Sequence, residues 1–335
     1  MANYSIGVDL GGTNLRIAAV GEQGNLLEKI TLGTRVTLGR DFVINDMCQA
    51  IKELAAKYRT AKLIGIGIGV PGIIDLKTGM LHESPNLPGW SDYPVRAEIE
   101  KHLSTTVILE NDANSAALGE KWLGAAREFD DMAMLTLGTG VGGGLVLKGR
   151  IWHGMTGMAG ECGHITVEPN GALCGCGNHG CLEAYASATA IVRMAREAKA
   201  NGGALARAVS ADPEFSAKAV YNLAIQGDEE AKNIFRLVGR SIGIVLSNLV
   251  NALNLPIYVI GGGVSSAWDA FSPSIFEELR KRSLVYAASD PQPQANRQGA
   301  SAQVRTVGKS RTIVTRALLG SDAGLFGAAR LPMIS

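Results

Sequence analysis

The densest group of chemically reactive side chains lies between positions 164 and 181. Cys174, Cys176 and Cys181 place three thiols within eight residues, and His164 stands ten residues before the first of them. Thiolates and imidazoles are the ligands that Zn²⁺ prefers, and four of them complete a closed tetrahedral site. The spacing therefore predicts a structural zinc site made of His164, Cys174, Cys176 and Cys181.

Free buried thiols or a redox pair are the alternatives to a metal site. Glycines at 175, 177 and 180 argue against a packed core, and a Cys-x-Cys pair is poorly spaced for a disulfide. His179 lies inside the loop and could compete as a ligand, and Cys162, two residues before His164, could be a further thiol nearby. Cys48 lies in a segment with helical apolar spacing and is interpreted as a core residue. An odd total of five cysteines suits a reduced compartment better than a set of disulfides.

Two glycine turns between expected strands form a second group of candidate residues. The first is Gly11-Gly12-Thr13-Asn14, which follows Asp9, and the second is Gly138-Thr139-Gly140. Since glycine has no Cβ, such a turn can direct several backbone N–H groups at one phosphate. A carboxylate at a strand end can hold Mg²⁺, usually through water. From its four residues alone, the first turn is explained more simply as a plain hairpin turn.

The second turn matches the GxGxxG pattern of dinucleotide-binding proteins in its letters but not in its context. That pattern must open a helix, whereas Leu145-Val146-Leu147 continues as a strand. The sequence has no GxxxxGK[ST] phosphate loop either. A third run, Gly261-Gly262-Gly263, also follows an expected strand. The three glycine segments together predict a nucleotide bound between two lobes.

Glu110-Asn111-Asp112 ends a short expected strand and begins an Ala-rich helix. A carboxylate at this place could accept the hydroxyl proton of a sugar as a phosphoryl group arrives. An N-cap aspartate explains Asp112 equally well from the local sequence. The residues alone leave both interpretations open.

Apolar spacing and glycine punctuation indicate an α/β chain. The strand–turn–strand segments around the two glycine turns resemble each other, which predicts two similar lobes that face a cleft. Strands are expected at 4–10, 15–20, 26–32, 63–70, 107–111, 132–137, 144–147, 257–260 and 312–318. Helices are expected at 41–58, 112–123, 188–200, 216–226, 228–253, 271–282 and 322–330, and the polar stretch Asp290–Ala302 indicates an exposed loop.

The composition excludes several classes of protein. With 335 residues, 46% of them hydrophobic and 19% charged, the chain can bury the core of one large domain or of two lobes. The formal net charge of +1 gives no electrostatic basis for binding nucleic acid or an anionic membrane. No stretch approaches a membrane span, and MANYSIGVDL enters a strand pattern without a signal sequence. We therefore expect a cytoplasmic protein without nucleic-acid or membrane partners.

Several motifs resemble those of known families. DLGGTNLR at Asp9–Arg16 looks like the first phosphate motif of the actin-like ATPase superfamily, LGTGVGGG at Leu137–Gly144 like the second, and IGGGVS at Ile260–Ser265 like the adenosine motif. The segment from Glu161 through the three cysteines to Glu183 closely resembles the signature of the ROK family of repressors, open reading frames and kinases. The resemblance implies a two-lobed actin-like ATPase (ribonuclease H-like) α/β fold with a cleft between the lobes. Residues 1–112 and 320–335 would form a small lobe, and 113–319 a large lobe with the zinc loop.

The ROK resemblance also implies roles for single residues. Asp112 would be the general base, because NDANSAALGE is similar to the catalytic stretch of that family. His164 would serve both the zinc ion and a sugar hydroxyl. The implied sugar-binding residues are Gly72, Asn86, Asn111, Asp112, Glu161, His164 and Glu183. The implied residues for ATP and Mg²⁺ are Asp9, Gly11, Gly12, Thr13, Asn14, Gly138, Thr139, Gly140, Gly262 and Gly263.

The implied function is that of an ATP-dependent hexose kinase with Mg²⁺ and structural Zn²⁺, in particular a glucokinase that makes glucose 6-phosphate. An N-acetylmannosamine or N-acetylglucosamine kinase would share every motif, and fructose, allose and donors other than ATP stay open. A sugar-responsive transcriptional repressor is the alternative from another class. Such repressors carry a helix-turn-helix before the kinase-like part, and here the first phosphate motif begins at Asp9. A homodimer or higher homo-oligomer is expected from the family alone.

Overall fold

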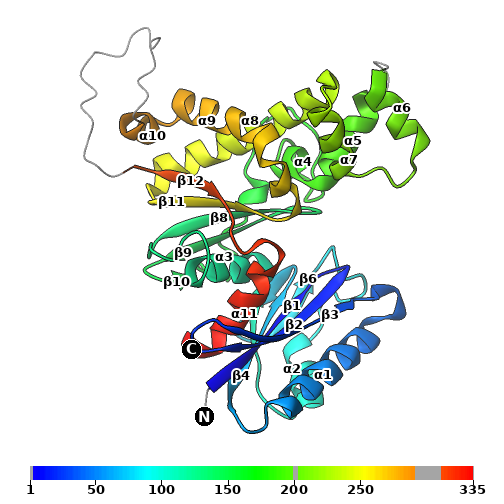
Figure 1. Ribbon diagram of the computed structural model, residues 1–335, viewed down its shortest axis with the longest axis vertical. Coiled ribbons are helices and arrows are strands. Elements are labelled where there is room, and N and C mark those ends of the chain that lie inside the picture. The colour runs from blue at the N-terminus through cyan, green and yellow to red at the C-terminus, as the bar shows by residue number, and fades with distance from the viewer. Residues whose placement is uncertain (1–2, 199–202, 291–310, 335) are drawn as a thin grey trace. The chain divides into compact units, whose positions relative to one another are not determined.

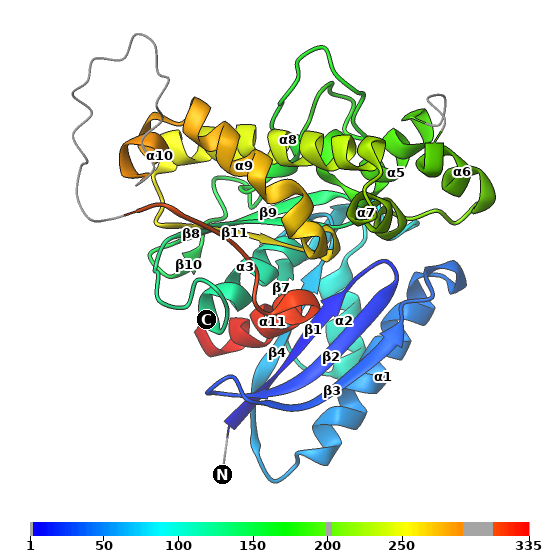
Figure 2. The same cartoon turned by 45° about the horizontal axis from the view of Figure 1, so that its top comes forward.

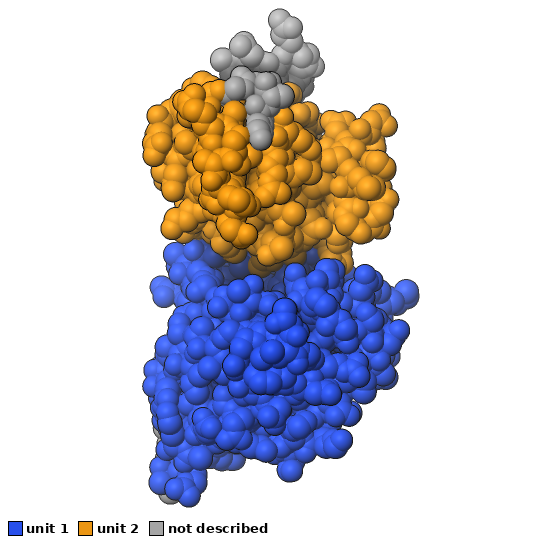
Figure 3. Space-filling model, turned by 90° about the vertical axis from the view of Figure 1, so that its right-hand side faces the viewer, with its two compact units in different colours: residues 1–134, 143–160, 317–335 blue, residues 135–142, 161–316 orange. Residues whose placement is uncertain are grey.

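The computed structural model describes residues 3–198, 203–290 and 311–334, and the chain divides into two compact units (Figure 3). Unit 1 comprises residues 1–134, 143–160 and 317–335, and unit 2 comprises residues 135–142 and 161–316. The lobe boundary expected after residue 112 differs from this division, which places helix α3 (Asp112–Trp122) in unit 1. The reason is close packing of α3 on helix α11 (Ala323–Ile334). A Cβ on Gly119 would lie 2.1 Å from the carbonyl oxygen of Ala323.

Unit 1 is built on a five-stranded sheet in the order β3-β2-β1-β4-β7 (Figure 1). β1 pairs antiparallel with β2 and parallel with β4, which in turn pairs parallel with β7. The parallel register places Asp9 opposite Gly69, and Val70 opposite Asn111. The ends of these three strands therefore lie along one edge of the sheet. The strands are β1 (Asn3–Leu10), β2 (Asn14–Gly21), β3 (Leu26–Gly33), β4 (Lys62–Val70) and β7 (Ile108–Asn111), and β4 is followed by a hairpin of β5 (Ile73–Asp75) and β6 (Met80–Glu83).

Helices cover both faces of this sheet (Figure 1). One face forms the main apolar core with α1 (Arg40–Lys57) and α2 (Val95–Leu103). On the other face, Leu325 of α11 packs with Ala18 and Val20 of β2. Glycine in β4 permits this approach, because a Cβ on Gly67 would lie 2.0 Å from the carbonyl oxygen of Ala328. The sheet is thus fixed from both sides, which immobilises its strand ends.

A second five-stranded sheet has the order β10-β9-β8-β11-β12. β9 pairs antiparallel with β10, and β11 pairs parallel with β12. All five residues of β11 are buried, as expected for a strand covered on both faces. The strands are β8 (Met132–Leu137), β9 (Val141–Leu147), β10 (Arg150–Ile151), β11 (Ile257–Gly261) and β12 (Ile313–Arg316).

In unit 2 the long helix α8 (Glu229–Leu253) lies beside α9 (Trp268–Arg282) (Figure 2). The contact is close, since a Cβ on Gly239 would lie 2.1 Å from the carbonyl oxygen of Phe271. Among the described residues, α8 is the one helix long and apolar enough to cross a membrane, and 61% of its apolar window is buried inside the protein. The other helices of the unit are α4 (Glu183–Ala186), α5 (Ala188–Glu197), α6 (Gly203–Ala211), α7 (Ala217–Ile225) and α10 (Leu284–Ser289).

Every strand and helix expected from the sequence is present, with shifts of a few residues at the ends. The structure adds short elements that carry little periodic signal: β5, β6, β10, α2, α4, α6 and α10. α2 is typical, since only Val95 and Ile99 of its nine residues are buried. The polar stretch Asp290–Ala302 lies outside the described residues except for Asp290, whose carboxylate pairs with Arg280 at 2.7 Å.

Candidate functional site

The turn between β7 and α3 carries the candidate base. Asp112 is the first residue of α3, and its Oδ1 accepts a hydrogen bond from the N–H of Ala113 at 2.9 Å. The partial positive charge of a helix N-terminus favours an ionised carboxylate at this place. The N-cap itself is Asn111, whose Oδ1 accepts the N–H groups of Ala113 and Asn114 at 2.9 and 3.2 Å. The structure thus corrects the interpretation of Asp112 as the N-cap, because the residue before it performs that task.

Asn111 also joins this turn to the end of β4. Its Nδ2 donates a hydrogen bond to the carbonyl oxygen of Gly72 at 3.2 Å. Gly72 has φ +112°, and a Cβ there would lie 2.1 Å from the carbonyl oxygen of Glu83, so only glycine fits. Three residues with a predicted sugar-binding role, Gly72, Asn111 and Asp112, are therefore neighbours in unit 1.

Beside this turn lies a hydrogen-bonded pair that the sequence pattern does not predict, a buried carboxylate with a partly exposed histidine. Glu110 is 3% exposed, and its Oε2 accepts a hydrogen bond from Nε2 of His153 at 2.7 Å. The hydrogen bond to Glu110 raises the pKa of His153, although burial acts in the opposite direction. The signal that could have found Glu110 is an acidic residue at a buried position of a short strand.

The first glycine turn also lies in unit 1. The N–H of Gly11 donates to the carbonyl oxygen of Asn14 at 2.9 Å, and the hydroxyl of Thr34 donates to the carbonyl oxygen of Gly11 at 2.6 Å. Gly12 packs on the backbone of Asn86, since a Cβ there would lie 2.8 Å from the carbonyl oxygen of that residue. Two predicted site residues from distant motifs, Gly12 and Asn86, are thereby brought together.

Asp9 is the next-to-last residue of β1, close to this turn. It lies opposite Arg16 in the β1–β2 register, and Nη1 of Arg16 donates to its Oδ2 at 3.0 Å. Burial raises the pKa of the Asp9 carboxyl, and the nearby Arg16 guanidinium opposes that rise. A carboxylate at a strand end, with its charge partly balanced in this way, has the oxygen ligands that Mg²⁺ requires.

The second glycine turn and the third glycine run meet in unit 2. The N–H of Gly138 donates to the carbonyl oxygen of Gly140 at 2.9 Å, which closes the turn. Gly262 has φ +81°, and a Cβ there would lie 2.4 Å from the carbonyl oxygen of Leu137 at the end of β8. The position of a Cβ on Gly263 has no atom within 4 Å. These segments, predicted to contact one nucleotide, are therefore adjacent.

Glu183 holds the second glycine turn from the side of the cysteine loop. Its Oε2 accepts the N–H of Val141 at 2.9 Å, and a Cβ on Gly140 would lie 2.4 Å from that oxygen. The hydroxyl of Thr189 donates to the carbonyl oxygen of Thr139 at 2.9 Å. Glu183 carries a predicted sugar-binding role, and its contacts in the structure are with the predicted nucleotide turn.

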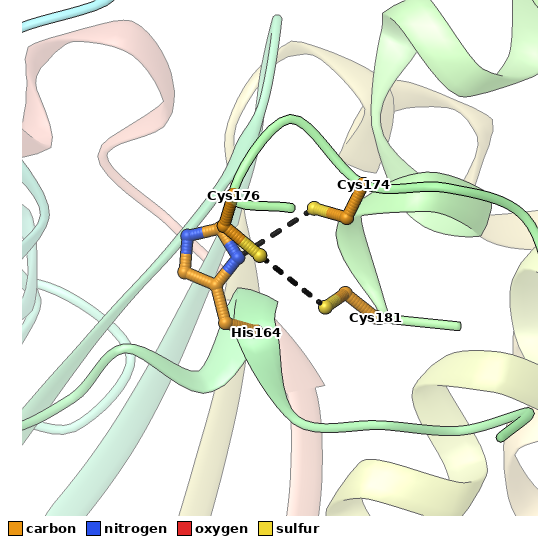
Figure 4. A group of neighbouring side chains, drawn as sticks. All are labelled: His164, Cys174, Cys176 and Cys181. Atoms are coloured by element: carbon orange, nitrogen blue, oxygen red, sulfur yellow. Dashed lines mark hydrogen bonds between the residues drawn. The ribbon is translucent and has the colours of Figure 1, made fainter. Parts of the chain in front are cut away.

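The four predicted metal ligands lie together in unit 2 (Figure 4). Their ligand atoms are all within 4.8 Å of one another, with Sγ of Cys174 3.7 Å from Nδ1 of His164 and Sγ of Cys176 3.7 Å from Sγ of Cys181. Zn–S bonds of about 2.3 Å in a tetrahedron place two sulfurs about 3.8 Å apart. Burial raises the pKa of the Cys174 thiol to about 12, so a bound cation is what would stabilise its thiolate. The donor set and its spacing fit Zn²⁺.

Among the described residues, the group of possible metal ligands includes neither the competing His179 nor the nearby Cys162. Nδ1 of His179 lies 3.0 Å from the carbonyl oxygen of Gly171, and the buried Cys162 has a thiol pKa raised by burial to about 11. Cys48 is 1% exposed in the apolar core of unit 1, which confirms its interpretation as a core residue.

His164 presents its two ring nitrogens to different groups. Nδ1 points to the thiols, whereas Nε2 lies 3.9 Å from Oε2 of Glu161. Both side chains are partly open to solvent, at 37% for His164 and 53% for Glu161. This arrangement is compatible with one imidazole that serves a metal ion and a polar ligand.

The predicted site residues thus fall into two groups, one in each unit. Unit 1 holds Asp9, Gly11, Gly12, Thr13, Asn14, Gly72, Asn86, Asn111 and Asp112. Unit 2 holds Gly138, Thr139, Gly140, Glu161, His164, Cys174, Cys176, Cys181, Glu183, Gly262 and Gly263.

Known proteins resemble this chain over almost its whole length. A glucokinase of Halalkalibacterium halodurans is 38% identical over 333 residues, which covers 98% of this chain and 94% of the relative. A glucokinase of Thermotoga maritima is 41% identical over 283 residues, which covers 84% of this chain and 87% of the relative. A solved ROK family glucokinase from Streptomyces griseus, in complex with glucose and AMPPNP, has a TM-score of 0.76 at 32% identity and 98% coverage of both chains.

More distant relatives carry other names. An N-acetylmannosamine kinase of Haemophilus influenzae is 29% identical and covers 97% of this chain and 93% of its own length. A xylose repressor of Bacillus subtilis is 30% identical over 84% of this chain and 70% of its own length. The sequence model of the ROK family matches residues 5–333 of this chain. Together with the paired glycine turns and the Cys₃His cluster, this match shows that the chain has the actin-like ATPase fold and belongs to the ROK family.

Proposed function

We propose that this protein is an ATP-dependent sugar kinase of the glucokinase type, which transfers the γ-phosphate of ATP to the 6-hydroxyl of glucose. The observation that carries the proposal is the position of Asp112 at the N-terminus of α3, directly after Asn111, whose side chain is hydrogen-bonded to Gly72. The two glucokinase relatives and the glucose complex of the solved neighbour support the choice of glucose.

In the proposed reaction Asp112 accepts the proton of the sugar hydroxyl. The loose transition state of phosphoryl transfer requires little covalent chemistry from the protein, so positioning of the hydroxyl and the base is what matters. Asn111 fixes the start of α3 by capping it, and its second contact ties the turn to Gly72. The carboxylate is thereby attached to two strands of a sheet that is packed on both faces.

The phosphates of ATP are assigned to the glycine turns. Backbone N–H groups of the Gly11–Thr13 and Gly138–Gly140 turns would contact them, other than those of Gly11 and Gly138, which close the turns themselves. Gly262 and Gly263 would lie beside the adenosine. Asp9 would hold Mg²⁺ through water, and the ion would neutralise charge on the phosphates.

The zinc ion is assigned a structural task. His164, Cys174, Cys176 and Cys181 would hold it and so order the loop between Gly163 and Glu183. The ordered loop would then present Nε2 of His164 and the carboxylate of Glu161 to sugar hydroxyls, since metal ligation fixes the orientation of the ring. We also propose a cytoplasmic homodimer or higher homo-oligomer without nucleic-acid partners.

The experiment that tests this function measures ADP release with Mg-ATP across six sugars. Glucose, mannose, fructose, allose, N-acetylmannosamine and N-acetylglucosamine are compared at matched concentrations, with zinc content verified. Selective turnover of glucose is the expected result. Selective turnover of an N-acetylated sugar would move the protein to the kinase class of its Haemophilus relative, and silence on all six would refute the proposal.

A further inference from the structure

We propose that His153 is a positioning residue, which acts through Glu110 to fix the orientation of the turn that carries Asn111 and Asp112. The inference rests on the kinase function proposed above, but its structural basis lies entirely within unit 1.

The carboxylate of Glu110 is the centre of the arrangement. Its Oε1 accepts the backbone N–H of Asn111 at 2.9 Å and Nδ2 of Asn114 at 3.0 Å, and its Oε2 accepts Nε2 of His153 at 2.7 Å. Since a carboxylate offers no hydrogen to donate, Nε2 of His153 must carry the proton in this contact. Glu110 therefore holds the residue before the candidate base and a residue in the first turn of α3.

Burial makes the carboxylate of Glu110 dependent on its hydrogen-bond donors. Glu110 is 3% exposed, and an isolated buried carboxylate is costly unless donors or a cation compensate it. Asn114 shows how strongly the site requires donors. Its Nδ2 faces Glu110, although its buried Oδ1 then has no hydrogen-bond partner among the described residues. His153 supplies the remaining donor and, when protonated, the compensating charge.

His153 comes from a part of the chain distant in sequence. It follows β10, the N–H of Ala159 donates to its carbonyl oxygen at 3.2 Å, and Gly154 after it has φ +66°. His82 and Asp92 form a similar pair at 3.0 Å, but their side chains are 51% and 80% exposed. Among the described residues, neither side chain of this exposed pair is hydrogen-bonded to the turn of Asn111 and Asp112, so the pair offers a matched control.

The test compares His153→Ala, His153→Gln and the control His82→Ala by steady-state kinetics with glucose and Mg-ATP. Loss of the donor lets the turn reorient, and a displacement of about 1 Å can cost about 100-fold in rate. We expect His153→Ala to lower kcat about 10- to 100-fold with KM for glucose changed less than about 3-fold. His153→Gln, whose amide can still donate to Glu110, should recover most of kcat, and His82→Ala should leave both constants unchanged.

A purely structural role would give a different result. If His153→Ala lowers the melting temperature but keeps the kcat of the folded enzyme, or if His153→Gln is as impaired as His153→Ala, the inference is overturned. Should His153→Ala not fold, His153→Asn replaces it, because the amide of Asn reaches less far than that of Gln. The kcat of His153→Asn is then expected to lie below that of His153→Gln by the same factor. Failure of the kinase proposal is distinguishable, because the unmodified protein would then be inactive on all six sugars.

Discussion

Oε2 of Glu183 accepts the backbone N–H of Val141 at 2.9 Å, while Oε1 of the same carboxylate lies 3.6 Å from Sγ of Cys174. One side chain thereby connects the cysteine loop with the second glycine turn, both of which belong to unit 2. A glutamate with only a sugar-binding role would have no need of the Val141 contact. The relationship indicates that order in the cysteine loop supports the segment assigned to the phosphates.

Glu183→Ala is therefore expected to weaken nucleotide binding even without sugar. Loss of a hydrogen bond to a charged acceptor costs about 1.5–3 kcal/mol, which corresponds to roughly a 10-fold or greater rise in the Kd of AMPPNP. Isothermal titration calorimetry with AMPPNP and Mg²⁺ measures this Kd. Glu168→Ala, at an exposed position of the same loop, is the control. An unchanged nucleotide Kd beside a large loss of glucose affinity would restrict Glu183 to the sugar.

Asp112→Asn should separate chemistry from binding. The amide keeps the shape of the side chain but cannot accept the hydroxyl proton, so kcat should fall by about 10²–10⁴-fold. Glucose affinity, measured by titration calorimetry, should change less than about 3-fold because the turn keeps its Asn111 cap. The exposed Asp92→Asn serves as control. Retained turnover in Asp112→Asn would assign the base to another residue.

Local sequence was sufficient for elements and ligands with a strong short-range pattern. The Cys₃His spacing identified all four members of a group whose ligand atoms lie within 4.8 Å of one another. Long periodic elements such as α8 were also predicted with near-correct ends. These features depend on residues close in sequence or on a repeating apolar pattern, so no tertiary information was needed.

Contacts between distant segments could not be predicted in the same way. Glu110 and His153 are 43 positions apart, and the register of β4 with β7 and the path after β10 bring them to 2.7 Å. The choice of Asn111 rather than Asp112 as the N-cap depends on where β7 ends, and strand ends are the least certain part of a sequence pattern. The assignment of α3 to unit 1 depends on its packing against α11. The small residues at that contact do not indicate in the sequence which helix they pack against.

The zinc content of cysteine variants should distinguish the predicted ligands from the other thiol nearby. Cys176 is the exposed member of the group, so Cys176→Ser should lose zinc without a cavity in the core. We expect a bound-zinc ratio near zero by mass spectrometry, a lower melting temperature and weaker glucose binding. Cys162→Ala, two positions from His164 but outside the group, should keep one zinc per chain. Unaltered glucose affinity after verified zinc loss would refute the coupling of the metal to the sugar.

The pair of Glu110 and His153 should make stability depend on pH. The pKa of His153 is raised above its ordinary value of about 6.5, so the pair contributes stability fully below that pH. The contribution is lost as pH rises through the raised pKa. The free energy of unfolding in urea should therefore fall more for His153→Gln at about pH 5.5 than at about pH 9. An equal loss in the free energy of unfolding at both pH values would show that folding does not stabilise the protonated histidine. His82→Gln serves as the control for a change at an exposed histidine.

Glu120 gives the sharpest stability prediction, because it is a fully buried carboxylate whose partners are backbone N–H groups. Its oxygens accept from Ala125 at 2.8 Å, from Leu318 at 3.1 Å and from Leu319 at 2.7 Å, which fixes the chain just before α11. The side chain of Leu318 is 73% exposed, so these hydrogen bonds rather than apolar burial hold it.

Glu120→Gln replaces one acceptor oxygen with an NH₂ group that must face at least one of these donors. An unpaired buried donor costs about 1–3 kcal/mol, and Gln creates a donor–donor contact in addition, so the free energy of unfolding should fall by at least that amount. Urea denaturation measures the loss, and Glu128→Gln, whose side chain is 76% exposed, should change stability by less than about 0.5 kcal/mol. A loss for Glu120→Gln no larger than that of the control would mean that the segment before α11 is held by other contacts, and that the three hydrogen bonds contribute little to the packing of α11 on the sheet.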